Sequence, residues 1–189
     1  MLALSIPTGI IGLWFYSQYA ANKEVEEYLK SEKAHPAADR ITVKNYELKE
    51  VDDANHMRWQ LIAETGIMGA ASKDVLLKEV TVRYFDGDKV KLRLSAPAGI
   101  ANEGKHEVKL GSKNGRRVQC EGQDGKAKLD AEKVELTKKN QFLATGGVTI
   151  TMPGVAQVTG SEATGSLEKD ADLKNFKICG NTHALLGHM

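Results

Sequence analysis

The stretch Leu92-Arg93-Leu94-Ser95-Ala96 decides the fold, because it alternates apolar and polar residues with the period of a β-strand and its ending recurs along the chain. This ending is a leucine, then any residue, then an alanine, and it recurs as Leu61-Ile62-Ala63 and Leu129-Asp130-Ala131. Ser161-Glu162-Ala163 is a looser fourth copy. The alanines are 33, 35 and 32 residues apart. A fixed period of this length indicates stacked units, since one short unit cannot bury its apolar face without neighbours. The pattern predicts an elongated β structure with a continuous apolar interior.

Alternating runs continue from residue 41 to about residue 178, separated by turn signals such as Asp86-Gly87 and Asn114-Gly115, whose residues accept positive φ at low cost. They predict about a dozen short strands and an all-β domain over residues 41–186. Glycines follow the last three copies at Gly111, Gly146 and Gly180, which are 35 and 34 residues apart. The small residues of the repeat either narrow the space between facing sheets or leave room for a ligand chain, and the sequence leaves both open.

The first 21 residues are set apart by composition. Residues 2–21 carry no charged side chain, and about 20 apolar residues match the hydrocarbon thickness of a bilayer. We therefore expect a transmembrane anchor over residues 1–21, followed by a juxtamembrane helix and linker over residues 22–40. A cleaved signal peptide is the alternative, but cleavage after Ala20 or Ala21 puts Gln18 or Tyr19 where a small residue is needed. Charge alone does not orient the anchor, because the lysines that follow it are mixed with acidic residues.

The formal net charge is +1, which argues against a nucleic-acid partner. Cys120 and Cys179 lack the spacing of a zinc site. They are interpreted as two strand cysteines that do not meet, with one disulfide in an oxidising compartment as the alternative.

No catalytic motif is present, so we predict no catalytic residue, no cofactor and no metal. Residues 52–56 (Asp-Asp-Ala-Asn-His) are interpreted as a polar turn, with a metal site as the alternative. Arg116-Arg117 is interpreted as a solvated edge that could alternatively meet a phosphate. An enzyme on a β scaffold would need paired carboxylates, and the pairs to check are Asp74 with Glu79 and Glu132 with Glu135.

Three stretches together resemble the LptC family, the membrane-anchored periplasmic component of lipopolysaccharide export. They are Met57-Arg58-Trp59-Gln60-Leu61-Ile62-Ala63, the run from Val75 through Tyr84 to Asp86-Gly87, and Leu92-Arg93-Leu94-Ser95-Ala96-Pro97-Ala98-Gly99. The resemblance implies an elongated twisted β-jellyroll of OstA-like repeats, open along one side, with a lipid groove and no enzymatic activity. It also implies an inner-membrane ABC transporter at the N-terminal edge and a soluble periplasmic bridge protein of the same fold at the C-terminal edge.

The chain is therefore predicted to be a single-pass inner-membrane protein whose main domain lies in the periplasm and carries lipopolysaccharide. A membrane-anchored structural β module that binds only proteins is the alternative. By alternation phase, the groove candidates are Trp59, Leu61, Val80, Val82, Leu92, Leu94, Val108, Leu110, Leu129, Val134, Leu136, Val148 and Ile150. The partner-docking edges are predicted at Ile41, Val43, Phe176 and Ile178.

Overall fold

The computed structural model describes residues 40–52, 54–69, 72–122, 125–137, 141–166 and 176–187. The described residues belong to one compact unit, Arg40–Met189. The predicted anchor over residues 1–21 and nearly all of the predicted helix and linker over residues 22–40 lie outside the described residues, although Arg40 already belongs to the first strand. Within the described ranges, no helix has the length and apolar character needed to cross a membrane.

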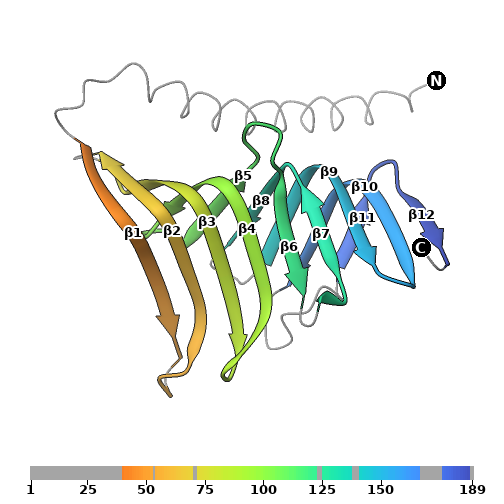
Figure 1. The fold of residues 1–189 in the computed structure, drawn as a ribbon, viewed down its shortest axis with the longest axis horizontal. Coiled ribbons are helices and arrows are strands. Elements are labelled where there is room, and N and C mark those ends of the chain that lie inside the picture. The colour runs from red at the N-terminus through yellow and green to blue at the C-terminus, as the bar shows by residue number, and fades with distance from the viewer. Residues whose placement is uncertain are drawn as a thin grey trace, which may run out of the picture. The chain divides into compact units, whose positions relative to one another are not determined.

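The described residues form twelve strands in one sheet (Figure 1). The strands are β1 (Arg40–Val51), β2 (Met57–Gly69), β3 (Asp74–Asp86), β4 (Lys89–Asn102), β5 (Glu107–Gly111), β6 (Val118–Gly122), β7 (Lys128–Ala131), β8 (Lys133–Leu136), β9 (Gln141–Met152), β10 (Ala156–Ser166), β11 (Phe176–Cys179) and β12 (His183–Leu186). The all-β prediction is confirmed.

Every long strand is interrupted near its middle by a residue without a pairing partner. In β1 the pairing skips Asn45, in β3 it skips Glu79, and in β10 it skips Ser161. Asn45 and Glu79 have positive φ values of 53° and 49°, so the backbone changes direction there. The interruptions that follow one another from strand to strand near the middle of the sheet are Asn45, Glu64, Glu79, Pro97, residues 112–117, Glu132, Gly146 with Gly147, Ser161 and residues 180–182. We call this row the bend line.

The bend line divides the sheet into two facing layers. One layer, here the β5 layer, contains β5, β8 and β11, and the other, the β6 layer, contains β6, β7 and β12. Each of β1, β2, β3, β4, β9 and β10 gives one half to each layer. In Figure 1, β6 and β7 lie in front of β5 and β8.

Counted across the bend line, β5 with β6, β7 with β8, and β11 with β12 each act as one bent strand. The sheet is then a meander in which neighbours follow one another along the chain. The Greek-key crossovers that define a jellyroll in the strict sense do not occur among the described strands. The structure therefore confirms an all-β sheet folded into two layers, but it does not confirm the strand connections of a jellyroll.

The repeated leucine–alanine pattern lies beside the bend line. Ala63, Ala96 and Ala131 are buried and directly precede it in β2, β4 and β7. Small side chains fit there because the layers converge; a Cβ on Gly99 in the β5 layer would come within 3.3 Å of Val80 in the β6 layer. The space is therefore narrowed by these residues. Ala163 is not their equivalent, because it lies past the bend in β10, and the corresponding residue is Gly160.

Candidate functional site

Three apolar ladders of paired residues cross nine strands each and face the space between the layers. In the β6 layer one ladder is Leu48, Leu61, Val82, Leu94, Cys120, Leu129, Ile150, Val158 and Ala184. In the β5 layer the ladder beside the bend line is Val43, Gly66, Leu77, Gly99, Leu110, Val134, Ala144, Ala163 and Ile178. The outer ladder of that layer is Ile41, Met68, Val75, Ala101, Val108, Leu136, Phe142, Gly165 and Phe176.

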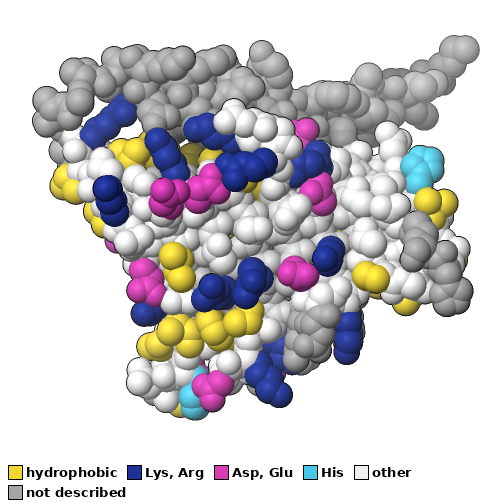
Figure 2. Space-filling view, viewed as in Figure 1, with side chains coloured by type: hydrophobic (Ala, Val, Ile, Leu, Met, Phe, Trp, Pro, Cys, Tyr) yellow, Lys and Arg dark blue, Asp and Glu magenta, His cyan; other side chains and the backbone are white. Residues whose placement is uncertain are grey.

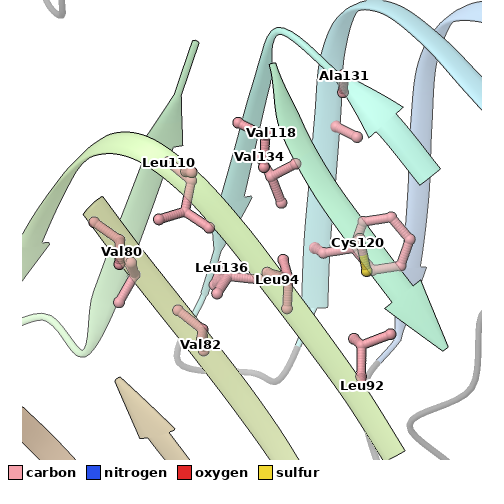
Figure 3. Packing of buried hydrophobic residues seen from close by; sticks show 14 of the residues in the cluster. Val80, Val82, Leu92, Leu94, Leu110, Val118, Cys120, Ala131, Val134 and Leu136 are labelled. Atoms are coloured by element: carbon pink, nitrogen blue, oxygen red, sulfur yellow. The ribbon is translucent and has the colours of Figure 1, made fainter. Parts of the chain in front are cut away.

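The thirteen residues predicted from alternation phase all lie on this inner surface. Twelve of them are buried, and Trp59 is half-buried and packs against the same cluster. Figure 3 shows Val80, Val82 and Leu94 of one layer with Leu110, Val134 and Leu136 of the other, and all belong to one cluster of buried residues. Whether they contact lipid stays a prediction.

The interior is packed beside the bend line but hollow where the layers diverge. A hollow of about 260 Å³ is lined from the β6 layer by Trp59, Val82 and Tyr84 and from the β5 side by Val108 and Leu136. A second hollow of about 190 Å³ adjoins it and shares Glu50, Trp59, His106 and Val108. Each is smaller than the roughly 300–1,000 Å³ of pockets that enclose a drug-sized molecule. The hollow has room for part of an acyl chain.

Polar contacts hold the rim of this hollow in place. The Trp59 indole Nε1 donates a hydrogen bond to Glu50 Oε2 at 2.6 Å, and Arg58 Nη1 donates to Glu50 Oε1 at 3.1 Å. The Tyr46 hydroxyl donates to Glu103 Oε1 at 2.8 Å, which links β1 to the turn between β4 and β5. Burial and this hydrogen bond raise the pKa of Tyr46, and burial raises the pKa of Tyr84. Both phenols are therefore neutral at pH 7.

The two ends of the strand order are β1 and the bent pair β11 with β12. Ile41 and Val43 end the two β5-layer ladders on one side, and Phe176 and Ile178 end them on the other. Ile41 is 60% exposed, and in β12 Leu185 and Leu186 are also exposed. The apolar inner surface thus reaches both edges of the sheet, where, within the described ranges, no further strand pairs with β1 or with β11.

The polar features singled out from the sequence are engaged in structural contacts. Asp52 Oδ1 accepts hydrogen bonds from the backbone N–H groups of Ala54 and His56, which defines a polar turn and lowers the pKa of Asp52. In the part of the chain that the structure describes, no group of three His, Cys, Asp or Glu residues could hold a metal ion. Cys120 is buried, Cys179 is half-buried, and the two are not joined.

Arg116 and Arg117 also have partners within the chain. Arg116 Nη1 donates to Glu79 Oε2 at 3.0 Å, and this pairing lowers the pKa of Glu79. Arg117 binds Asp130 and the carbonyl oxygens of Gly146 and Gly147, so it braces the bend in β9. Glu79 is therefore occupied by Arg116, and Glu132 Oε1 lies 3.8 Å from Arg117 Nη1.

Sequence reasoning left several inner residues out of the groove set. Tyr46, Val75, Leu77, Tyr84, Val118 and Phe142 are buried on the same surface. Their alternation phase could have identified them. Glu50, Arg58 and His106 line the hollow without any sequence signal, because only the packing of the two layers brings them together.

The described residues thus form a meander of strands folded into two layers, with an apolar inner surface and an edge strand at each end of the strand order. The chain matches the family described as "Lipopolysaccharide-assembly, LptC-related" over residues 5–175 and belongs to it. The resemblance noted from the sequence is confirmed, and the protein is a component of lipopolysaccharide transport.

Among solved structures, the chain is similar to LptH of Pseudomonas aeruginosa, described as the LptA-homologous periplasmic component of a lipopolysaccharide transport device. The identity is 9%, the match covers 78% of this chain and 94% of that chain, and the TM-score is 0.31. No curated protein matches the chain significantly.

Proposed function

We propose that this protein accepts lipopolysaccharide from an inner-membrane ABC transporter on its apolar inner surface and passes it to a soluble periplasmic bridge protein of the same fold. The observation that supports this most is the continuity of the three ladders from β1 to the C-terminal strands. An acyl chain in water loses about 0.8 kcal/mol for every exposed methylene. A path lined by apolar residues from edge to edge removes that cost along its whole length.

The lipid enters where the layers diverge. The hollow between Trp59, Tyr84 and Val108 is the space already open, and the layers separate further to admit more of the lipid. The path is open along the side opposite the bend line, so the bulky polar headgroup stays in water. No residue needs to perform chemistry, because each lipid is displaced by the next one delivered.

The edges serve as docking strands. β1 receives the transporter's periplasmic part and β11 receives the bridge protein, each by addition of a strand to the sheet. A partner with the same folded meander continues the ladders that end in Ile41 and Val43 or in Phe176 and Ile178. Residues 1–21 anchor the protein in the inner membrane as a single span, with the main domain in the periplasm.

Site-specific photo-crosslinking to labelled lipopolysaccharide tests the lipid path. Crosslinkers at Val108 and Leu136 face the hollow, and matched crosslinkers at Lys109 and Glu135 occupy the neighbouring outward positions of the same strands. We expect lipid adducts at the first pair and none at the second. Equal labelling at both pairs would contradict the proposal.

A second measurement separates lipid transport from a module that binds only proteins. The full chain is purified from detergent-solubilised membranes and assayed for bound ABC transporter and for bound lipopolysaccharide. Both should be present. Recovery of the transporter with no lipid at any stage of an ATP-driven cycle would favour the protein-only module.

A further inference from the structure

The outer face of the β6 layer carries two arginines directly opposite each other. Arg83 of β3 pairs in register with Arg93 of β4. Their chain neighbours Val82, Tyr84, Leu92 and Leu94 are buried on the inner face, so the two guanidinium groups point outward. Like charges opposite each other on neighbouring strands repel, and such a pair is unfavourable unless something neutralises it.

Other cations of this face are paired with carboxylates, and these two are not. Lys49 lies 2.9 Å from Glu47, Lys91 lies 3.2 Å from Asp86, and Lys128 lies 3.5 Å from Glu121. Glu121 is the residue opposite Arg93 in β6, but its carboxylate is the one bound by Lys128. Neither Arg83 nor Arg93 has an ion-pair partner among the described residues. Figure 2, viewed from the side of β6 and β7, shows Lys and Arg side chains gathered near the middle of this face.

The neighbouring pair on the same face adds hydroxyl groups. Thr81 is opposite Ser95, two residues along each strand from the arginines. We call Thr81, Arg83, Arg93 and Ser95 the donor square. It offers two guanidinium groups and two hydroxyls and contains no carboxylate. Such a set suits a ligand made of acceptor oxygens, and the arginine fork matches phosphate oxygens bidentately.

Arg83 supplies an independent observation. Its Nε is the buried side-chain nitrogen without a hydrogen-bond partner among the described residues. A buried donor left unpaired is costly, and native proteins rarely keep one without a reason. An anion held between the two arginines would bring an acceptor to this side chain and neutralise the repulsion at once.

We propose that the donor square binds a phosphate group. The site lies on the outer face, on the opposite side of the β6 layer from the lipid path, and does not depend on that path carrying lipid. The phosphate belongs either to a lipid headgroup or to a free phosphate anion. The recognition chemistry is the same for both sources, and the experiment distinguishes them.

The test uses the full-length protein in a neutral detergent. Thermal unfolding and titration calorimetry are measured with inorganic phosphate against chloride at equal ionic strength, and with mixed micelles containing phosphatidic acid or phosphatidylcholine. We expect saturable binding and a raised Tm with phosphate. Tighter binding of phosphatidic acid micelles than of phosphate would identify a lipid headgroup as the source. Tighter binding of inorganic phosphate would identify a free anion.

Variants assign the binding to the site. R83Q/R93Q should weaken phosphate binding by about tenfold or more, because it removes both charge-assisted donors. R83K/R93K should retain part of the binding, since lysine keeps the charge without the fork. K49Q, on the same face, should bind as the wild type does, since Glu47, the partner of Lys49, keeps its hydrogen bond from Gln60. Without phosphate R83Q/R93Q should be at least as stable as the wild type; if it does not fold, R93Q replaces it, because Arg93 is exposed.

Two results would overturn the proposal. One is a wild-type protein that responds to phosphate no more than to chloride and to phosphatidic acid no more than to phosphatidylcholine. The other is a folded R83Q/R93Q, or R93Q in its place, that binds phosphate with unchanged affinity.

Discussion

The hydroxyl of Tyr46 donates a hydrogen bond to Glu103 Oε1 at 2.8 Å across 57 positions of sequence. Tyr46 directly follows the bend in β1 and belongs to the β6 layer, whereas Glu103 lies in the turn that ends the β5-layer half of β4. The contact therefore joins the two layers close to the N-terminal edge. It adds a polar link between two layers whose facing side chains are mostly apolar.

Tyr46→Phe should lower the free energy of unfolding by about 1 kcal/mol, because it removes this hydrogen bond and keeps the ring. The raised pKa of Tyr46 gives the effect a pH dependence. A tyrosine with a raised folded-state pKa contributes its full stability below the ordinary value of about 10 and loses it as the pH rises further. Denaturant unfolding at pH 7 and above pH 10 should therefore show the gap between wild type and variant narrowing. A gap that stays constant over this range would count against the assignment.

The Tyr46 ring lies on the inner face of β2, where Gly66 leaves room for it. A Cβ on Gly66 would come within 2.9–3.0 Å of three ring and Cβ atoms of Tyr46. Gly66→Ala should therefore destabilise the domain by about 1–3 kcal/mol through overpacking. Gly69→Ala, in the same strand, is the matched control, since its nearest neighbour, Ser72 Cβ, would be at an ordinary 3.7 Å. Urea unfolding compares the free energies of unfolding of the two variants. Equal values would show that the Tyr46 ring shifts to make room for the added methyl group.

Much of this architecture could be predicted from alternation. Every residue assigned to the interior by phase lies on the inner surface, because a strand at a two-layer interface has only two faces to choose between. The bend line also leaves a trace: the inward residues Val43 and Tyr46, and again Leu77 and Val80, are three apart where regular alternation gives two. That slip of one residue is the sequence signature of a bulge.

Other features could not be read from the sequence. The period puts the fourth copy of the repeat at Ala163, but the bend in β10 falls at Ser161, so Gly160 is the residue equivalent to the alanines of the other copies. The period alone does not show which side of a bend a residue occupies. The hollow depends on how far Trp59 and Val108 are held apart, which is set by the divergence of the layers. Likewise, the sequence does not show that Glu121, the acidic residue opposite Arg93, is bound by Lys128.

The N-terminal edge can be tested at a single exposed residue. Ile41 ends the outer ladder of the β5 layer, and Ile41→Asp should leave stability within about 0.5 kcal/mol, as is usual for exposed positions. It should reduce co-purification of the ABC transporter, because a carboxylate at the end of the ladder opposes an apolar continuation. Val51→Asp is the matched control in the same strand, 48% exposed but in the β6 layer. Equal loss with both variants would show that the docking does not follow the β5-layer ladder.

A substitution in the hollow can test lipid transport without changing the stability of the domain. Val108→Phe adds bulk where about 260 Å³ is empty, so the unfolding free energy should change by less than about 1 kcal/mol. Val134→Phe adds the same bulk beside the bend line, where Val134 is 1% exposed, and should cost about 1–3 kcal/mol. If the hollow admits acyl chains, Val108→Phe alone combines a normal Tm with a strong loss of lipopolysaccharide crosslinking. A folded Val108→Phe protein that crosslinks to lipid as efficiently as the wild type would mean that the chains pass elsewhere between the layers.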